Sequence, residues 1–188
     1  MNDLETRIQG IRLLVLDVDG VLTDGKLFFD GEGRPFRAIH ARDAAAFTLW
    51  RLAGRRMALV SGLGSAAVEE IARRWRFDDC LTWVRDKERA CRELAEKYDL
   101  DMEALAFLGD DLIDRNAMRA AGLAVAVADA APEAKAVAHW VTEAPGGAGP
   151  AREVITRVLN AQGLLEQAVE AYCNRKDEPD ETAAPSLQ

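Results

Sequence analysis

Residues 13–20 read LLVLDVDG, a continuous aliphatic run that ends in two acids one residue apart and a glycine. A run that is apolar at every position, rather than at every second one, predicts a strand buried on both faces of a sheet. Asp17 and Asp19 then lie at the carboxyl end of that strand, where open α/β sheets bind their ligands. Two carboxylates this close repel each other unless a cation lies between them, and Mg2+ is the hard, oxygen-seeking ion that suits them.

The composition favours one aliphatic α/β domain that acts on a small substrate. The chain has 188 residues, 49% of them hydrophobic and 6% aromatic, with a net charge of -8. This charge argues against a nucleic-acid partner or an anionic membrane surface. The first ten residues lack an apolar segment, and no stretch reaches the roughly eighteen apolar residues of a membrane span. Three widely spaced cysteines, Cys80, Cys91 and Cys173, indicate a reducing compartment, so we expect a cytoplasmic protein.

Strand-like and helix-like segments alternate along the rest of the chain. The predicted strands cover residues 57–61, 81–84, 104–108, 123–128 and 140–142. The predicted helices cover residues 44–53, with Asp43 as N-cap, 65–75, 86–98, 112–121, 131–138 and 151–159, and one more could follow at 162–172. This alternation implies right-handed crossovers and therefore a doubly wound parallel sheet of the Rossmann-like α/β class.

Two segments depart from the alternation. Residues 26–40 hold two short strand-like runs around a glycine-rich turn, which predicts a β-hairpin inserted after the first strand. Residues 174–188 are charged, contain proline and have few large apolar side chains, so we expect a disordered tail. The sequence therefore predicts a single domain over residues 1–173 that includes the hairpin.

Four polar signals stand at the carboxyl ends of successive predicted strands, or at the helix starts just after them. They are Asp17-x-Asp19, Ser61-Gly62, Lys87, and Gly109-Asp110-Asp111 with Asp114. Taken singly, each also fits a turn, a helix cap or a solvated cation. Together they would surround one crevice of a parallel sheet. Such a set supports phosphoryl transfer through an aspartyl-phosphate, with Mg2+ offsetting the repulsion between an anionic nucleophile and an anionic substrate.

This arrangement resembles the haloacid dehalogenase-like phosphatases over nearly the whole ordered chain. The resemblance implies that Asp17 is the nucleophile and a Mg2+ ligand. It implies that Asp19 is the general acid that protonates the leaving oxygen and later activates water, and that its backbone carbonyl also binds the metal. Asp110 would complete the metal site.

The resemblance also assigns residues to the phosphate. Ser61 and the Gly62 amide would hold phosphate oxygens, because backbone N–H groups of a turn bind oxyanions. Lys87 would bind phosphate and steady the nucleophile, because a fixed ammonium stabilises charge that spreads over the equatorial oxygens. Asp111 and Asp114 would lie close behind the metal site.

The insertions between these motifs leave no room for a cap domain. The stretches LDVDGVLTDG (16–25), HARD (40–43), GDDLID (109–114), AVAD (126–129) and AREV (151–154) resemble those of the capless 3-deoxy-D-manno-octulosonate 8-phosphate phosphatases. That family implies a small phosphorylated sugar acid as substrate, a role in lipopolysaccharide biosynthesis, and a homotetramer assembled through the hairpins. The apolar hairpin residues Leu27, Phe28, Phe29 and Ile39 suit such burial.

The chain departs from this family where arginines are expected. Leu63 and Ala148 stand at two such positions, and AAA at residues 44–46 replaces a glycine-rich segment. Arginine is suited to bidentate carboxylate or phosphate contacts, so Arg42 and Arg152 are the candidates to replace the missing ones. A related nonulosonate 9-phosphate or another sugar phosphate stays open as substrate.

Two other classes of protein compete with the phosphatase. A phosphoacceptor receiver domain also gathers acids, a hydroxyl and a lysine around Mg2+, but it carries adjacent acids on its first strand and the phosphorylated aspartate on a later one. A catalytically weak scaffold would keep the fold and lose turnover, and Leu63 and Ala148 are the residues that favour it.

Overall fold

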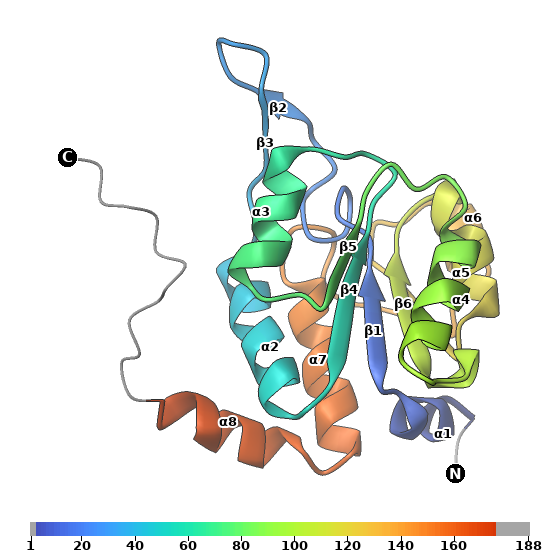
Figure 1. Cartoon of the computed structure of the whole chain (residues 1–188). Coiled ribbons are helices and arrows are strands. Elements are labelled where there is room, and N and C mark those ends of the chain that lie inside the picture. Colours follow the sequence, from blue (N-terminus) through green and yellow to red (C-terminus); the bar gives the residue numbers. More distant parts are fainter. Residues whose placement is uncertain (1–2, 176–188) are drawn as a thin grey trace.

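The computed structural model describes residues 3–175 and centres on one six-stranded sheet. The strand order is β5-β4-β1-β6-β7-β8, and every neighbouring pair is parallel (Figure 1). The strands are β1 (Leu13–Leu16), β4 (Arg56–Val60), β5 (Asp79–Leu81), β6 (Leu105–Gly109), β7 (Leu123–Ala126) and β8 (Trp140–Val141). The chain winds outward from β1 in both directions, which confirms the predicted doubly wound α/β fold.

Helices cover both faces of the sheet. They are α1 (Asp3–Gly10), α2 (Ala41–Leu52), α3 (Ala66–Arg74), α4 (Lys87–Lys97), α5 (Arg115–Ala120), α6 (Pro132–Lys135), α7 (Pro150–Ala161) and α8 (Leu165–Cys173). Figure 1 shows α2, α3 and α7 on one face and α4, α5 and α6 on the other. The sequence analysis missed α1, which packs through the fully buried Ile8. None of the described helices is long and apolar enough to cross a membrane.

The central strand β1 is buried on both faces, as its unbroken aliphatic sequence predicts. All four of its side chains are fully buried. Leu16 lies beside Leu59 of β4 and Leu108 of β6. Burying an aliphatic side chain of this size stabilises a fold by about 1.5–3 kcal/mol. The strand that presents Asp17 is therefore among the most firmly held parts of the molecule.

The segment between β1 and α2 forms the predicted hairpin and no cap domain. Its strands β2 (Phe28–Phe29) and β3 (Pro35–Phe36) are antiparallel and form a separate small sheet. Figure 1 shows the hairpin projecting from the edge of the main sheet where the strands end. The rings of Phe28 and Phe36 stack with centroids 5.4 Å apart, and both side chains are exposed.

The start of α2 differs from the prediction. His40, not Asp43, is the N-cap, and its Nδ1 accepts a hydrogen bond from the backbone N–H of Arg42 at 3.1 Å. Asp43 lies in the first turn of α2 and is fully buried, and its Oδ1 accepts the backbone N–H of Arg152 at 2.7 Å. The N-cap of α7 is Gly149, which has no side chain. Asp43 therefore caps α7 from a neighbouring helix.

We expect Asp43 to make the stability depend on pH. Burial, the largest effect, raises the pKa of Asp43 from 3.8 to about 6 although the backbone N–H of Arg152 lowers it. A folded-state pKa above the unfolded one stabilises the fold at low pH, and this contribution is lost as the pH rises through about 6. Between about pH 4.5 and 7.5 the wild type should lose about 2 kcal/mol of unfolding free energy relative to Asp43→Asn.

Urea denaturation of both proteins at the two pH values measures this difference. The comparison cancels the titration of all other groups, because both proteins contain them. Parallel pH dependences of the two unfolding free energies would contradict the expectation.

Three other predictions are corrected at their boundaries. The strand predicted at residues 81–84 is β5 (Asp79–Leu81), because the chain turns at Trp83, whose φ is 60°. The helix predicted at 112–121 is a 3-10 turn, Leu112–Asp114, followed by α5. The helix predicted at 131–138 is only α6. Of the expected disordered tail, residues 176–188 lie outside the described part of the chain.

Candidate active site

The parallel register brings three strand ends to one edge of the sheet. The backbone N–H of Asp17 donates to the carbonyl of Leu108 at 3.0 Å, so Asp17 directly continues the pairing of β1 with β6. Ser61 follows β4 and Asp110 follows β6 in the same way. These positions are set by the backbone pairing, which explains why the sequence pattern could predict them.

Lys87, the first residue of α4, joins two acids inside the protein. Its Nζ lies 2.8 Å from Oδ1 of Asp17 and 2.6 Å from Oδ1 of Asp114. The side chains of Lys87 and Asp114 have no exposed surface. Burial disfavours the ammonium, but the two carboxylates outweigh it and raise the pKa of Lys87. The lysine is therefore a fixed positive charge beside the predicted nucleophile.

The site holds more carboxylates than this one lysine can balance. Burial, followed by the charge of Asp114, raises the pKa of Asp17 to about 6 although Lys87 lowers it. Burial, followed by the charges of Asp17 and Asp114, raises the pKa of Asp110 to about 8. A cation bound among them would favour the ionised carboxylates.

The carboxylate oxygens of this cluster fit a magnesium ion. One oxygen from each of Asp17, Asp110 and Asp114 can be chosen so that all lie within 4.8 Å of one another. Within residues 3–175, no hydrogen-bond donor reaches the buried Oδ1 of Asp110. Gly20 makes room for Asp110, because a Cβ at Gly20 would lie 2.0 Å from its Oδ2. Hard oxygen ligands of this kind are those that Mg2+ prefers.

Asp114 orients the cluster, because both its oxygens are already engaged. Oδ1 accepts from Lys87, and Oδ2 accepts the backbone N–H groups of Asp110 at 2.9 Å and Asp111 at 3.2 Å. Asp111 caps the 3-10 turn through the backbone N–H of Leu112 at 2.7 Å. The oxygens available to a metal therefore belong to Asp17 and Asp110, with Asp114 and Asp111 holding the turn behind them.

Ser61 is buried beside the site, and its hydroxyl serves its own turn. Oγ donates to the carbonyl of Leu63 at 2.6 Å and accepts the backbone N–H of Leu63 at 3.1 Å. The hydroxyl has to rotate before it can donate to a phosphate oxygen. A phosphate-binding role for Ser61 and for the Gly62 amide stays a prediction.

Arg37, which the sequence analysis missed, holds the predicted general acid. Its Nε donates to Oδ1 of Asp19 at 2.7 Å and its Nη2 donates to Oδ2 at 3.0 Å. Its Nη1 donates to Oγ of Ser65, the N-cap of α3, at 2.6 Å. The Arg37 side chain is almost fully buried. The only local signal was an arginine directly after the second strand of the hairpin. Such a signal does not reveal a partner eighteen residues away.

Arg42 and Arg152, the candidates to replace the missing substrate arginines, lie at helix starts. Arg42 is exposed in the first turn of α2, and Arg152 is half-buried in the first turn of α7. The backbone N–H of Arg152 serves the cap at Asp43. A substrate contact by either guanidinium stays a prediction.

The parallel sheet with this set of acids and one lysine at its carboxyl edge defines a haloacid dehalogenase-like hydrolase. The family model with that description matches residues 84–149. The 3-deoxy-D-manno-octulosonate 8-phosphate phosphatase KdsC of Escherichia coli (strain K12) is 36% identical over 166 residues, which cover 88% of each protein. The chain belongs to this phosphatase family, and the receiver-domain alternative is wrong.

Solved structures agree with this relationship. The phosphatase of the same name from Yersinia pestis has a TM-score of 0.85 and 36% identity, with 88% of this chain and 89% of that chain covered. The enzyme from Moraxella catarrhalis, solved with magnesium, phosphate and KDO, has a TM-score of 0.88 and 29% identity, with 92% and 99% covered.

Proposed function

We propose that this protein is a Mg2+-dependent phosphatase that hydrolyses 3-deoxy-D-manno-octulosonate 8-phosphate to the free sugar acid and phosphate, as in lipopolysaccharide biosynthesis. The observation that carries the proposal is the buried Lys87, which lies within 2.8 Å of Asp17 and 2.6 Å of Asp114. The relatives named above act on this ester. A Mg2+ ion held by Asp17, Asp110 and the backbone carbonyl of Asp19 would supply positive charge that offsets the repulsion between the carboxylate and the phosphate.

The residues divide the reaction into two displacements. In the first, a carboxylate oxygen of Asp17 attacks phosphorus, the bond to the sugar oxygen breaks, and Asp19 gives that oxygen a proton. In the second, Asp19 takes a proton from water, the water oxygen attacks phosphorus, and Asp17 is released with free phosphate. Lys87 and the turn at Ser61 and Gly62 would hold the equatorial oxygens throughout.

Phosphate release tests the proposal. The panel contains 3-deoxy-D-manno-octulosonate 8-phosphate, a nonulosonate 9-phosphate and hexose phosphates, each with Mg2+ and with EDTA. We expect turnover with Mg2+, little with EDTA, and the highest kcat/KM for the eight-carbon acid. A preference for the nine-carbon ester would move the substrate to the nonulosonates. Metal binding without turnover of any ester would favour the catalytically weak scaffold.

Arg37→Ala is expected to lower kcat on the sugar phosphate about 10- to 100-fold, because the general acid loses the two bonds that orient it. Arg37→Lys should recover part of the loss. The rate on p-nitrophenyl phosphate should fall less, because its leaving group needs less proton transfer. Arg34→Ala is the matched control, since Arg34 is an exposed arginine of the same hairpin that pairs with Asp30. An equal fall with both esters would contradict a positioning role for Arg37.

The same family relationship supports a homotetramer assembled through the hairpin. Leu27, Phe28, Phe29 and Phe36 are exposed on it, and an isolated hairpin with such a surface is marginally stable. Light scattering should give a smaller molar mass for Phe29→Ser than for the control Val169→Ser, whose residue is exposed on α8. An unchanged mass for Phe29→Ser would place the contact elsewhere.

A cytoplasmic location is supported by the cysteines. Cys80, Cys91 and Cys173 are all free thiols, as expected in a reducing compartment. Fractionation of the native host, with the protein followed by antibody, tests this part of the proposal.

A further inference from the structure

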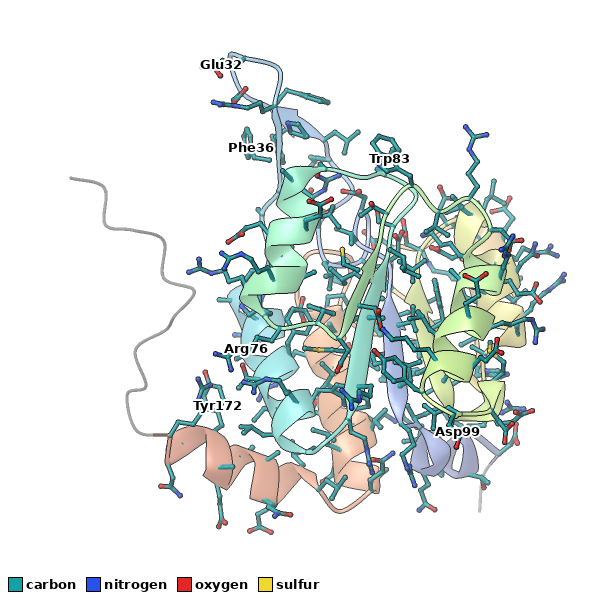
Figure 2. All side chains as sticks on the ribbon, in the orientation of Figure 1. Glu32, Phe36, Arg76, Trp83, Asp99 and Tyr172 are labelled. Atoms are coloured by element: carbon teal, nitrogen blue, oxygen red, sulfur yellow. The ribbon has the colours of Figure 1, made fainter. Side chains whose placement is uncertain are left out.

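Trp83 combines a strained backbone with an exposed side chain. Its φ is 60°, the left-handed region that bulky L-residues rarely adopt. Its side chain is 70% exposed, so burial does little to offset a strain of about 1–3 kcal/mol. Figure 2 shows Trp83 at the edge of the molecule from which the hairpin also projects. Strain of this kind collects at functional sites.

The indole of Trp83 lies against the turn predicted to bind phosphate. A Cβ at Gly64 would lie 2.2 Å from the indole Nε1 and 2.6 Å from Cδ1, so only glycine allows this close approach. The next residue is tied to the same turn, because the backbone N–H of Val84 donates to the carbonyl of Ser61 at 3.0 Å. This bond holds the backbone that carries the aromatic ring beside Ser61 and Gly62.

Two further side chains beside this turn, Leu63 and Ile113, are apolar. Both are exposed there. Cδ1 of Ile113 lies 3.0 Å from the place of a Cβ on Gly62, so Gly62 leaves room for it. A substrate that extends from the turn along Leu63, Ile113 and Trp83 meets carbon atoms and an indole face. The Arg37 guanidinium nearby is already engaged by Asp19 and Ser65.

We infer that Trp83 is a specificity-determining residue whose indole packs against the carbon–hydrogen face of the sugar in a phosphate ester bound at the Ser61–Gly62 turn. This inference rests on the proposed function. Tryptophan offers a rigid apolar face with few rotatable bonds, and ligand sites combine such walls with a few charged groups. Recognition by Trp83 and Leu63 accounts for a sugar site that lacks an arginine at position 63.

The experiment compares kcat/KM for the preferred sugar phosphate with kcat/KM for acetyl phosphate, which carries no sugar ring. Trp83→Gly should lower the ratio of these two constants about tenfold through a higher KM for the sugar ester. Glycine accepts a φ of 60° without strain, so the loop should keep its backbone. Trp83→Phe retains an aromatic face and should restore most of the ratio. Tyr172→Ala, at an exposed aromatic residue on the distant helix α8 (Figure 2), is the control.

The outcomes separate the two proposals. If the wild type hydrolyses acetyl phosphate and no sugar phosphate, both the proposed function and the role of Trp83 are wrong. If the wild type hydrolyses a sugar phosphate and Trp83→Gly leaves the ratio unchanged, only the role of Trp83 is wrong. A smaller molar mass of Trp83→Gly with an unchanged ratio would likewise overturn it, and would assign the indole to a contact between copies of the chain.

Discussion

Asp17→Asn is expected to lower phosphate release from the preferred ester at least about 10^4-fold, because the amide cannot form the aspartyl-phosphate. The fold should survive, since asparagine has nearly the same shape and its neutral side chain removes one charge from a cluster of two buried acids and one half-buried acid. Lys87 keeps Asp114 as its partner at 2.6 Å in the variant. The measurements are the initial rate with saturating Mg2+ and the thermal midpoint by circular dichroism.

Asp111→Asn is the matched control for this prediction. Asp111 is an acid of the same edge of the sheet, but it is exposed and caps a 3-10 turn. We expect its rate to fall less than about tenfold. The weaker cap should lower the free energy of unfolding by at most about 1 kcal/mol. An Asp17→Asn preparation that keeps more than about 1% of the wild-type rate would exclude Asp17 as the nucleophile, whereas equal losses in both variants would point to a general loss of charge.

Lys87→Met is expected to be the most destabilising single substitution in the site. It leaves the carboxylates of Asp17 and Asp114 buried without their ammonium partner, and breaking a buried ion pair in this way costs about 3–5 kcal/mol. The rate should fall about 10^2- to 10^3-fold as well, because one fixed donor to the developing negative charge is gone. Urea denaturation and initial rates measure the two losses.

A double variant separates the structural effect of Lys87 from the chemical one. Lys87→Met with Asp114→Asn removes one of the stranded carboxylates, so part of the stability should return while the rate stays low. The single variant should also gain stability relative to the wild type as the pH falls from about 7 to 5, because its unpaired carboxylates take up protons on folding. If the rate recovered together with the stability, Lys87 would be a structural residue only.

The fold could be predicted because its signals are local. The aliphatic run of β1 and the alternation of short apolar runs with amphipathic segments are properties of neighbouring residues, and they give strand and helix without knowledge of the packing. The boundaries of the strands and helices were predicted less accurately than their existence. At Trp83 the chain turns with a φ of 60°, a conformation that a tryptophan in the sequence does not predict. The strand predicted at residues 81–84 therefore covers Asp79–Leu81 instead.

By itself, the sequence determined that Asp17, Ser61, Lys87 and Asp110 follow successive strands of a parallel sheet, and hence that they share one edge. Backbone pairing brings Asp17, Ser61 and Asp110 together and the start of α4 adds Lys87, whereas the side-chain contacts made across the fold needed the tertiary structure. Only that structure showed Arg37 bound to Asp19 and Asp43 capping α7. It also showed the indole of Trp83 against Gly64. Periodicity sets which residues form an element, whereas such contacts depend on how elements distant in the chain pack, and no local pattern encodes them.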